Sequence, residues 1–371
     1  MSTSNNSKSI FSGKKIIITG HTGFKGSWLT KWLLKKGATV FGISNEIPTV
    51  PSLFETLELE NQIEHLIMDV RDTEDIVKTI HRIAPDFVFH LAAQPIVSIS
   101  YRDPVATLTT NAIGTANILE GIRGLSNKCV GIMITSDKCY ENVEWEYGYK
   151  ETDMLGGKDI YSGSKAAAEI VYHSYFHSFL KKMDNIRTAT VRAGNVIGGG
   201  DWAEDRIIPD CIRSWSENKR VFIRSPYATR PWQHVLEPLS GYLAIAAELW
   251  ESDKLNGESF NFGPVSDNNI TVLDLISRIS ERWKFKNPED SYDIQQNAAF
   301  SEAGLLKLNC DKALFHLKWI PTLDLKELVD FTGDWYYQFY NNKEGIKEYT
   351  ENQLQSYEEK AIAKKLKWTE N

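Results

Sequence analysis

The chain has 371 residues, which is too long for one small core and typical of one large domain or two closely packed domains. Its formal net charge of −7 argues against a general nucleic-acid-binding protein, and no apolar run approaches the roughly 18–20 residues of a membrane span. The four cysteines are scattered without metal-ligand spacing, which indicates a cytoplasmic protein with free thiols and no zinc site. Residues 1–13 are polar, lack the apolar stretch of a signal peptide, and are expected to form a loose tail.

The first half of the chain alternates short apolar segments with longer amphipathic ones. Strands are predicted at residues 15–19, 39–43, 65–68, 87–90, 130–134 and 188–191. Helices are predicted at residues 27–36, 73–83, 104–123 and 160–180, and Asp103 and Pro104 suit the first turn of the third. This alternation indicates a parallel sheet covered on both faces, so we expect an α/β fold with a Rossmann-type, doubly wound sheet.

The pattern becomes less regular after about residue 195. Further strands are predicted at residues 221–224 and 259–262, and further helices at 207–216, 236–250, 272–283 and 323–340. We therefore predict a Rossmann domain over residues 12–195, into which a later segment at about 232–255 is interleaved. A smaller mixed α/β lobe would comprise residues 196–231 and 256–345. The charged C-terminal extension, 346–371, is expected to be a helical surface cover or a partner-contacting helix.

A glycine-rich segment connects the first predicted strand to the first helix. Its Gly-x-x-Gly-x-x-Gly spacing allows a tight turn and a close approach of the backbone to a pyrophosphate, and the following helix N-terminus offers N–H donors. An ordinary strand–helix loop is the alternative, but the position after the first strand favours a dinucleotide site. The residues predicted to contact the cofactor here are Gly20, Thr22, Gly23, Phe24, Lys25 and Gly26.

The choice between NAD and NADP depends on the end of the second strand, where an acidic residue would bind the ribose hydroxyls. Ser44 and Asn45 are neutral, Glu46 lies slightly beyond, and no arginine is near, so NAD is favoured and NADP stays possible. His90 is expected to be a buried, hydrogen-bonded histidine. Further cofactor contacts are predicted at later strand ends and on one helix: Asp69, Val70, Leu91, Ala92, Ala93, Gln94, Thr135, Tyr161 and Lys165. A helix-capping role is the alternative for Asp69.

Tyr161 and Lys165 are spaced i and i+4, which places them on one face of a helix. A cation at ~4 Å favours a phenolate by roughly 4 kcal/mol at an effective dielectric constant of ~20, or about three pK units. Lys165, helped by the positive ring of the cofactor, is therefore expected to bring the pKa of Tyr161 toward neutrality. Tyr161 would then take the proton from a sugar hydroxyl while hydride leaves the same carbon. The Tyr-x-x-x-Lys pattern is common by chance, and the glycine-rich loop makes it informative.

Ser136, Asp137 and Lys138 follow the strand predicted at 130–134, at the sheet edge where active sites lie. Ser136 is suited to hydrogen-bond the reacting hydroxyl. Asp137 and Lys138 form an additional acid/base pair that simple alcohol oxidation does not need. A ketone at C4 acidifies the C5 proton, so Lys138 would remove that proton while Asp137, its pKa raised by burial, expels water from C6. A salt bridge between the two is the alternative.

Three residues after the first domain are candidates for binding a nucleotide diphosphate. Arg206 and Arg230 carry guanidinium groups, whose fork of N–H donors matches phosphate oxygens, and Asn195 offers an amide donor. Surface ion pairing is the alternative role for either arginine.

These segments together resemble the extended short-chain dehydrogenase/reductase family, of the NAD-dependent epimerase/dehydratase type, up to about residue 340. The runs at 19–28, 51–55, 135–142 and 230–238 are similar to the 4,6-dehydratases that act on CDP-glucose. Lys138 after Asp137 points to that branch, because dehydratases for dTDP-glucose and GDP-mannose usually carry a second carboxylate there. The resemblance implies conversion of CDP-D-glucose to CDP-4-keto-6-deoxy-D-glucose, in deoxysugar biosynthesis for lipopolysaccharide O-antigen, with NAD reduced and reoxidised in each turnover. It also implies a homodimer formed through the helices at 104–123 and 160–180.

Two other functions stay open at this stage. One is a nucleotide-sugar 4-epimerase, which would need Tyr161 and Lys165 but would give no role to Asp137 and Lys138. The other is a 4,6-dehydratase acting on another nucleotide sugar. No motif that reads cytosine is evident in the chain. A regulatory protein that only senses NAD(P) would not need Tyr161, so the intact Tyr/Lys pair argues against it.

Overall fold

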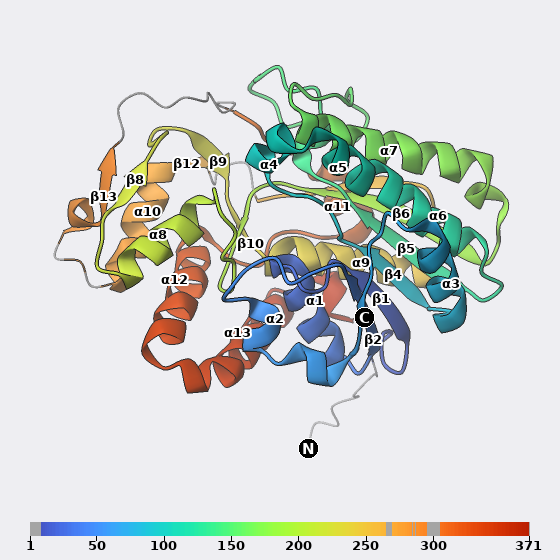
Figure 1. Ribbon diagram of the computed structural model, residues 1–371, viewed down its shortest axis with the longest axis horizontal. Coiled ribbons are helices and arrows are strands. Elements are labelled where there is room, and N and C mark those ends of the chain that lie inside the picture. Colours follow the sequence, from blue (N-terminus) through green and yellow to red (C-terminus); the bar gives the residue numbers. More distant parts are fainter. Residues whose placement is uncertain (1–8, 265–268, 284, 286, 295–304, 371) are drawn as a thin grey trace.

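The computed structural model describes residues 9–264, 269–283, 285, 287–294 and 305–370. Its central feature is a sheet of seven parallel strands in the order β11-β6-β5-β4-β1-β2-β3 (Figure 1). The strands are β1 (Lys15–Thr19), β2 (Thr39–Ser44), β3 (Glu64–Ile67), β4 (Phe87–His90), β5 (Cys129–Ile134), β6 (Ile186–Ala193) and β11 (Ser259–Phe262). The strand order reverses between β1 and β4, which is where ligands bind in such sheets. The predicted doubly wound α/β fold is confirmed.

Helices cover both faces of this sheet because successive strand residues point to opposite sides. Ile17 packs with the layer formed by α3 (Thr73–Ile83), α6 (Gly114–Arg123) and α7 (Ile160–Ser178). Ile16 and Ile18 belong to the larger core on the other face, against α1 (Phe24–Lys35) and α9 (Leu236–Glu251). The strand ends are thereby held between two helical layers.

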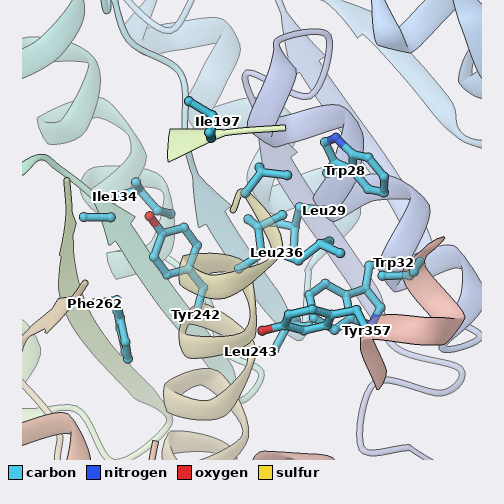
Figure 2. Packing of buried hydrophobic residues seen from close by; sticks show 14 of the residues in the cluster. Trp28, Leu29, Trp32, Ile134, Ile197, Leu236, Tyr242, Leu243, Phe262 and Tyr357 are labelled. Carbon is cyan, nitrogen blue, oxygen red and sulfur yellow. The ribbon is translucent and has the colours of Figure 1, made fainter. Parts of the chain in front are cut away.

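The core on the α1 side joins segments far apart in the chain. Figure 2 shows Trp28 and Trp32 of α1 beside Leu236 and Leu243 of α9, with Tyr357 of α13 (Ile346–Ala363) closing the group. The rings of Trp32 and Tyr357 meet edge to face with centroids 5.6 Å apart. The C-terminal helix is therefore docked on α1, the helix that begins at the glycine-rich loop.

The remaining elements form a smaller lobe beside the sheet and several connections. Its helices are α8 (Ile207–Ser216), α10 (Val272–Ser280) and α12 (Leu325–Asn341), while α11 (Asp311–Leu317) packs against β11 and α9. The short strands are β7 (Val196–Ile197), β8 (Val221–Ile223), β9 (Thr229–Pro231), β10 (Gln233–His234), β12 (Asn269–Thr271) and β13 (Tyr292–Ile294). The 3-10 helices are η1 (Leu59–Gln62), η3 (Asp137–Cys139), η4 (Leu180–Lys182), η5 (Glu281–Trp283), η6 (Pro288–Ser291), η7 (Lys343–Gly345) and η8 (Lys367–Glu370).

Two elements differ from the sequence-based expectation. The strand at 259–262, expected in the smaller lobe, is β11 and pairs with β6 in the main sheet. The helix predicted at 104–123 is divided into α5 (Pro104–Leu108), a π-helical turn at Thr109–Ile113, and α6. The turn contains Asn111, whose side chain bonds both the N–H and the C=O of Gln94, so a contact with the β4 loop accompanies the irregular turn.

Three short helices were not predicted, α2 (Leu53–Thr56), α4 (Val97–Arg102) and α11. They have four, six and seven residues, over which the apolar periodicity that identifies a helix is too short to detect. Within the part of the chain that the structure describes, no helix is both long enough and apolar enough to cross a membrane.

Candidate active site

The glycine-rich loop has the close backbone contacts expected of a dinucleotide turn. Gly20 has φ of +74°, and a Cβ there would lie 2.8 Å from the backbone nitrogen of Ala92. A Cβ on Gly26 would lie 2.1 Å from the carbonyl oxygen of Gly20. The N-cap of α1 is Gly23, so no side chain caps the first N–H groups of the helix. This arrangement fits a cofactor pyrophosphate.

The other residues of the loop divide between structural contacts and the site itself. Thr22 donates through its hydroxyl to the carbonyl of Glu46 at 2.7 Å, and Phe24 is half-buried. The charge of Lys25 interacts with charges of the catalytic site. Burial and the charge of Arg206 lower the pKa of Lys25 to about 7, while the charge of Asp137 opposes this shift. Lys25 was predicted only as a cofactor contact, and the structure places its charge among the catalytic groups as well.

Beyond the second and third strands, polar side chains at the predicted cofactor site form hydrogen bonds within the protein. His21 bonds Ser44 Oγ through Nδ1 at 2.9 Å and His65 Nδ1 through Nε2 at 2.7 Å, so a chain of polar side chains lies at the end of β2. Asp69 accepts from the backbone and side chain of Arg71, and the N-cap of α3 is Asp72, so Asp69 is not the helix cap that was weighed as its alternative role. Val70 is buried. The cofactor roles of Asp69 and Val70 stay predictions.

The segment after β4 lies against the glycine-rich loop. Ala92 donates its N–H to Thr19 Oγ1 at 3.1 Å, and Thr19 Oγ1 also bonds His90 Nδ1 at 2.7 Å. His90 contacts Thr115 through its other ring nitrogen, and burial lowers the pKa of His90 to about 3. It is the buried, satisfied histidine that was expected. The predicted cofactor residues of this segment, which run past the end of β4, are Leu91, Ala92, Ala93 and Gln94.

Tyr161 and Lys165 lie in the first turns of α7, whose N-terminus is capped by Asp159. Both side chains are buried. Burial raises the pKa of Tyr161 to about 12, although the hydrogen bond with Ser136 and the charge of Arg206 lower it. Burial also lowers the pKa of Lys165 to about 8. In the protein alone, desolvation of the phenolate outweighs nearby positive charge, so the pKa of Tyr161 lies above its ordinary value. A shift toward neutrality by Lys165 and the cofactor ring together stays a prediction.

Asp137 and Lys138 form the short turn η3 beside α7. Ser136 Oγ donates to Asp137 Oδ1 at 2.9 Å and accepts from the N–H of Lys138 at 3.2 Å. Lys138 Nζ lies 5.8 Å from the ring centroid of Tyr161. Burial raises the pKa of Asp137, although the charge of Lys138 opposes the shift. The structure thus brings together the five predicted catalytic residues: Ser136, Asp137, Lys138, Tyr161 and Lys165.

The second oxygen of Asp137 is distinctive. Asp137 Oδ2 is fully buried and has no hydrogen-bond partner among the described residues. The structure describes both Asp137 and Lys138, and no salt bridge joins them. The salt-bridge alternative for this pair is therefore not what the geometry shows. A buried carboxyl oxygen without a partner is costly unless a ligand or a proton satisfies it. The arrangement suits a carboxylic acid that donates a proton to a bound substrate.

The three predicted substrate residues lie on segments that follow β6. Arg206 pairs with the buried Asp201 at 3.0 Å, and its charge also influences Tyr161 and Lys25, so it belongs to the site. Arg230 lies in β9 and donates to the carbonyl of Thr229 at 2.9 Å. Asn195 is half-buried, and its carbonyl accepts from the N–H of Gln233. Diphosphate binding by Asn195, Arg206 and Arg230 stays a prediction.

Sequence reasoning missed two charged residues below the site, Glu169 and Arg192. They form an ion pair with 2.8 Å between Nη2 and Oε2, and their side chains are 0% and 1% exposed. Thr135, predicted to contact the cofactor, donates its hydroxyl to Glu169. The available signal was the spacing, since Glu169 follows Lys165 by four residues and so shares its helix face.

Comparison with known proteins agrees with this geometry. The family model described as GDP-mannose 4,6 dehydratase matches residues 17–332. CDP-glucose 4,6-dehydratase of Salmonella typhimurium is 44% identical over 333 residues, which is 89% of this chain and 92% of the relative. GDP-mannose 4,6-dehydratase of Yersinia enterocolitica is 30% identical over 45% of this chain and 46% of its own length.

A solved structure shows the same fold at lower identity. The dTDP-glucose 4,6-dehydratase of Bacillus anthracis, in complex with NAD, aligns with a TM-score of 0.73 and 18% identity over 89% of this chain and 98% of that one. The match of the family model and the long alignment to the Salmonella relative establish the relationship. The chain therefore belongs to the GDP-mannose 4,6-dehydratase family of extended short-chain dehydrogenases/reductases.

Proposed function

We propose that the protein is a CDP-glucose 4,6-dehydratase, a hydro-lyase that converts CDP-D-glucose to CDP-4-keto-6-deoxy-D-glucose. The observation that carries the reaction is the buried, unpartnered Asp137 Oδ2 in a turn directly beside Tyr161. A 4-epimerase needs no second acid at this place. The nucleotide is proposed from the 44% identical relative, whose name specifies CDP-glucose.

Oxidation at C4 would use Tyr161 and Ser136. Tyr161 would remove the proton of the C4 hydroxyl, and Ser136, which hydrogen-bonds Tyr161, would hold that hydroxyl in place. Because burial raises the pKa of Tyr161, its base form needs positive charge nearby. Lys165 would supply part of that charge and would hold the nicotinamide ribose. A nicotinamide bound at this site would take the C4 hydride and later return it to C6.

Elimination of water would use the pair in η3. Lys138 would remove the proton from C5, which the C4 ketone has acidified, and Asp137 would donate its proton to the C6 hydroxyl, which leaves as water. The raised pKa of Asp137 keeps it protonated for this step. After hydride addition at C6, the proton on Lys138 returns to C5. Tyr161 then holds the proton from the C4 hydroxyl and Asp137 has lost one, so the cycle closes when Tyr161 releases its proton and Asp137 takes one up.

The cofactor is proposed to be NAD. The residues present fit a dinucleotide, because Gly20 and Gly26 bring the loop close to the backbone of its neighbours and the N-terminus of α1 lacks a side-chain cap. The polar groups at the end of β2 are Ser44 and His21, and burial lowers the pKa of His21 to about 4. A neutral imidazole offers no charge for a 2′-phosphate, which supports NAD over NADP.

We also propose that the protein acts as a homodimer in the cytoplasm. Apolar side chains are exposed on α5, the π-helical turn, α7 and the C-cap of α7, where two helices of a partner would pack: Val105, Leu108, Ile113, Ile170 and Phe179. Exposed apolar side chains gathered on neighbouring helices favour an interaction site. All four cysteines are free thiols, which suits a reducing compartment. The product would enter deoxysugar biosynthesis, with O-antigen as one destination.

The test is incubation with CDP-glucose, dTDP-glucose, GDP-mannose and UDP-glucose in turn, with NAD supplied and products identified by mass spectrometry. Loss of one water from CDP-glucose at the highest kcat/KM is expected. Dehydration of another nucleotide sugar in preference to CDP-glucose would contradict the proposed nucleotide. An isomer of unchanged mass, with no dehydrated product from any of the four, would contradict the proposed reaction.

A further inference from the structure

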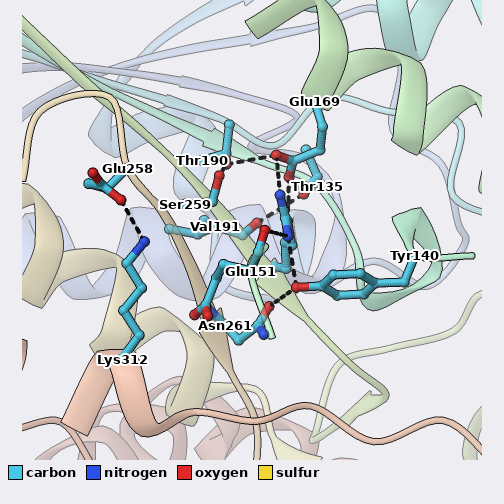
Figure 3. A network of polar contacts seen from close by, with 11 residues as sticks. Thr135, Tyr140, Glu151, Glu169, Thr190, Val191, Glu258, Ser259, Asn261 and Lys312 are labelled. Carbon is cyan, nitrogen blue, oxygen red and sulfur yellow. Dashed lines mark hydrogen bonds and ion pairs between the residues drawn. The ribbon is translucent and has the colours of Figure 1, made fainter. Parts of the chain in front are cut away.

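A buried ion pair lies beneath the catalytic residues and has no part in the chemistry described above. Arg192 of β6 meets Glu169 of α7 through two parallel hydrogen bonds, Nε to Oε1 at 2.9 Å and Nη2 to Oε2 at 2.8 Å (Figure 3). Burial disfavours the charged form of Glu169, but the adjacent Arg192 holds the pKa of Glu169 below its usual value. Both side chains are therefore charged in the interior of the protein.

The pair holds both ends of the turn that contains Ser136, Asp137 and Lys138. Before the turn, the hydroxyl of Thr135 donates to Glu169 Oε1. After the turn, Arg192 Nη1 donates to the Tyr140 hydroxyl at 2.7 Å. The Tyr140 hydroxyl in turn donates to Asn261 Oδ1 of β11 at 2.8 Å, so it has a donor and an acceptor in fixed positions (Figure 3).

The same pair is also attached to the helix that carries the redox residues. Glu169 follows Tyr161 by eight residues and Lys165 by four, so all three lie on one face of α7. Thr190 Oγ1 of β6 completes the coordination of Glu169 Oε2 at 2.9 Å. The ion pair thus connects α7, β5 and β6 at the point where the oxidation residues and the elimination residues face each other.

We propose that Glu169 and Arg192 are positioning residues that hold the Asp137–Lys138 turn in register with Tyr161 and Lys165, so that the sugar oxidised at C4 is committed to losing water. The inference rests on the proposed function. A stabilising role alone does not account for the pair, because an apolar pair of similar volume often stabilises a core as well. What apolar side chains cannot supply is directional bonds to Thr135 and Tyr140 at the two ends of one turn.

The test separates the two half-reactions. With CDP-glucose and NAD, the enzyme is mixed rapidly, and the fraction holding reduced nicotinamide is followed by its absorbance while the dehydrated product is quantified after quenching. If the elimination residues are displaced, the C4-oxidised intermediate loses water more slowly, and reduced cofactor therefore accumulates. Loss of folded protein lowers both signals together and leaves their ratio unchanged.

Tyr140→Phe and Thr135→Val each remove one bond to the turn and leave the ion pair in place. Each is expected to raise the ratio of reduced cofactor to product by about 3–10-fold, with KM within about 3-fold of wild type, because small displacements of reacting groups cost rate rather than binding. Glu169→Gln is expected to raise the ratio by about 10–100-fold.

Glu169→Gln leaves a buried charge unpaired and can unfold the protein, so a second variant keeps the test decisive. Glu169→Leu combined with Arg192→Met replaces both charges by apolar groups, which restores the fold and still removes the bonds to the turn. The control is Glu258→Gln, which breaks the neighbouring Lys312–Glu258 pair of 2.6 Å and is expected to leave the ratio unchanged (Figure 3).

Three outcomes are separated. An increased ratio in Tyr140→Phe, Thr135→Val and the folded double variant supports the positioning role. A wild-type ratio and kcat in the folded double variant would overturn it while leaving the dehydratase assignment intact. Absence of a dehydrated product from the wild-type enzyme would overturn the proposed function itself, and the positioning role with it.

Discussion

Asp137 and Tyr161 are buried in one site, yet the proposed reaction needs opposite protonation states of the two. Burial raises the pKa of both groups, because each becomes negatively charged on losing its proton. For Asp137 this shift supplies the acid. For Tyr161 it opposes formation of the base, so the proposed phenolate needs positive charge nearby. Arg206 supplies part of it in the protein, and Lys165 and the oxidised cofactor are proposed to supply the rest.

Replacing Lys138 tests whether elimination and oxidation use different residues. Lys138→Met is expected to lower kcat for dehydration by about 10²–10⁴-fold, because removal of the C5 proton loses its base. C4 oxidation keeps Tyr161 and Lys165, so reduced cofactor should accumulate in rapid-mixing absorbance measurements. The matched control, Lys150→Met, removes a lysine that is 65% exposed and should behave as wild type. Equal dehydration rates in the two variants would contradict the role of Lys138.

The raised pKa of Asp137 sets the direction of the pH dependence. The acid form is present below that pKa, so the dehydration rate should fall as pH rises through it. Asp137→Asn has no titrating proton, and its residual rate, reduced by about 10²–10⁴-fold, should lack this alkaline limb. The check is a pH profile of single-turnover dehydration. The control is Asp75→Asn, at an exposed carboxylate, which should keep the fall in rate at alkaline pH. If Asp137→Asn also kept that fall, the titrating group would be a residue other than Asp137.

At the scale of elements, the glycine-rich loop offers a matched pair of substitutions. Gly26→Ala would place a Cβ 2.1 Å from the Gly20 carbonyl oxygen, whereas the Cβ of Gly23→Ala would lie at an ordinary 3.4 Å. Gly26→Ala is expected to lower the free energy of unfolding by about 1–3 kcal/mol or more, as overpacking does. Gly23→Ala should leave stability near wild type and weaken NAD binding.

Urea unfolding and NAD titration measure these two effects separately. Equal stability of the Gly23→Ala and Gly26→Ala proteins would show that the close approach of the loop to α1 is not required. Unchanged NAD affinity in Gly23→Ala would place the pyrophosphate away from the N-terminus of α1.

The C-terminal helix α13 makes a buried contact with α9 through a titratable carboxyl group. Tyr357 donates its hydroxyl to Glu237 Oε2 at 2.9 Å, and burial raises the pKa of Glu237 from 4.5 to about 7. The stability that this shift contributes is complete below about pH 4.5 and is lost as pH rises toward 7, because the native state binds the proton more tightly. The charged carboxylate therefore needs the Tyr357 hydroxyl most above pH 7.

Tyr357→Phe is accordingly expected to cost about 1–3 kcal/mol at pH 8 and less at pH 5, measured by urea unfolding at both values. The control is Tyr227→Phe, at a tyrosine that is 74% exposed, where neither pH should show a change. A cost that is equal at the two pH values would mean that Glu237 does not change its charge in this range.

The sequence allowed the main sheet, and the meeting of the predicted catalytic residues at one sheet edge, to be predicted for identifiable reasons. Parallel strands buried on both faces appear as continuous apolar runs in the sequence. The spacing of a motif such as Tyr-x-x-x-Lys places both side chains on one face of a helix. What failed depended on tertiary contacts. The break near Asn111 lies where its side chain bonds Gln94, and β11 was assigned to the wrong lobe because partner choice in a sheet is not local.

The site shows the same limit. Glu169 and Arg192 are 23 positions apart in the sequence, and this separation does not indicate that their side chains form a buried ion pair. The raised pKa of Tyr161 was also unforeseen, because desolvation depends on how completely the folded chain excludes water. Charges near a group can be guessed from a motif, but the extent of its burial cannot.

For the whole molecule, the exposed apolar surface on α5, the π-helical turn and α7 predicts a dimer of twice the 42.2 kDa chain mass. Ile170→Lys, at a residue that is 57% exposed, should shift the protein toward monomer in sedimentation or light-scattering measurements, because a buried lysine opposes association. Ile362→Lys is matched in exposure, at 59%, and lies on α13, so it should remain dimeric. A monomeric wild-type protein would contradict the proposal.

In the proposed reaction, one active site oxidises C4, expels water across C5 and C6, and returns the same hydride to C6. The most direct measurement is turnover of CDP-glucose carrying deuterium at C4, with the product analysed by NMR and mass spectrometry. The expected product has lost one water and carries the deuterium at C6. Deuterium that stays at C4 in a product of unchanged mass, or exchanges into solvent before reaching C6, would contradict the proposed reaction.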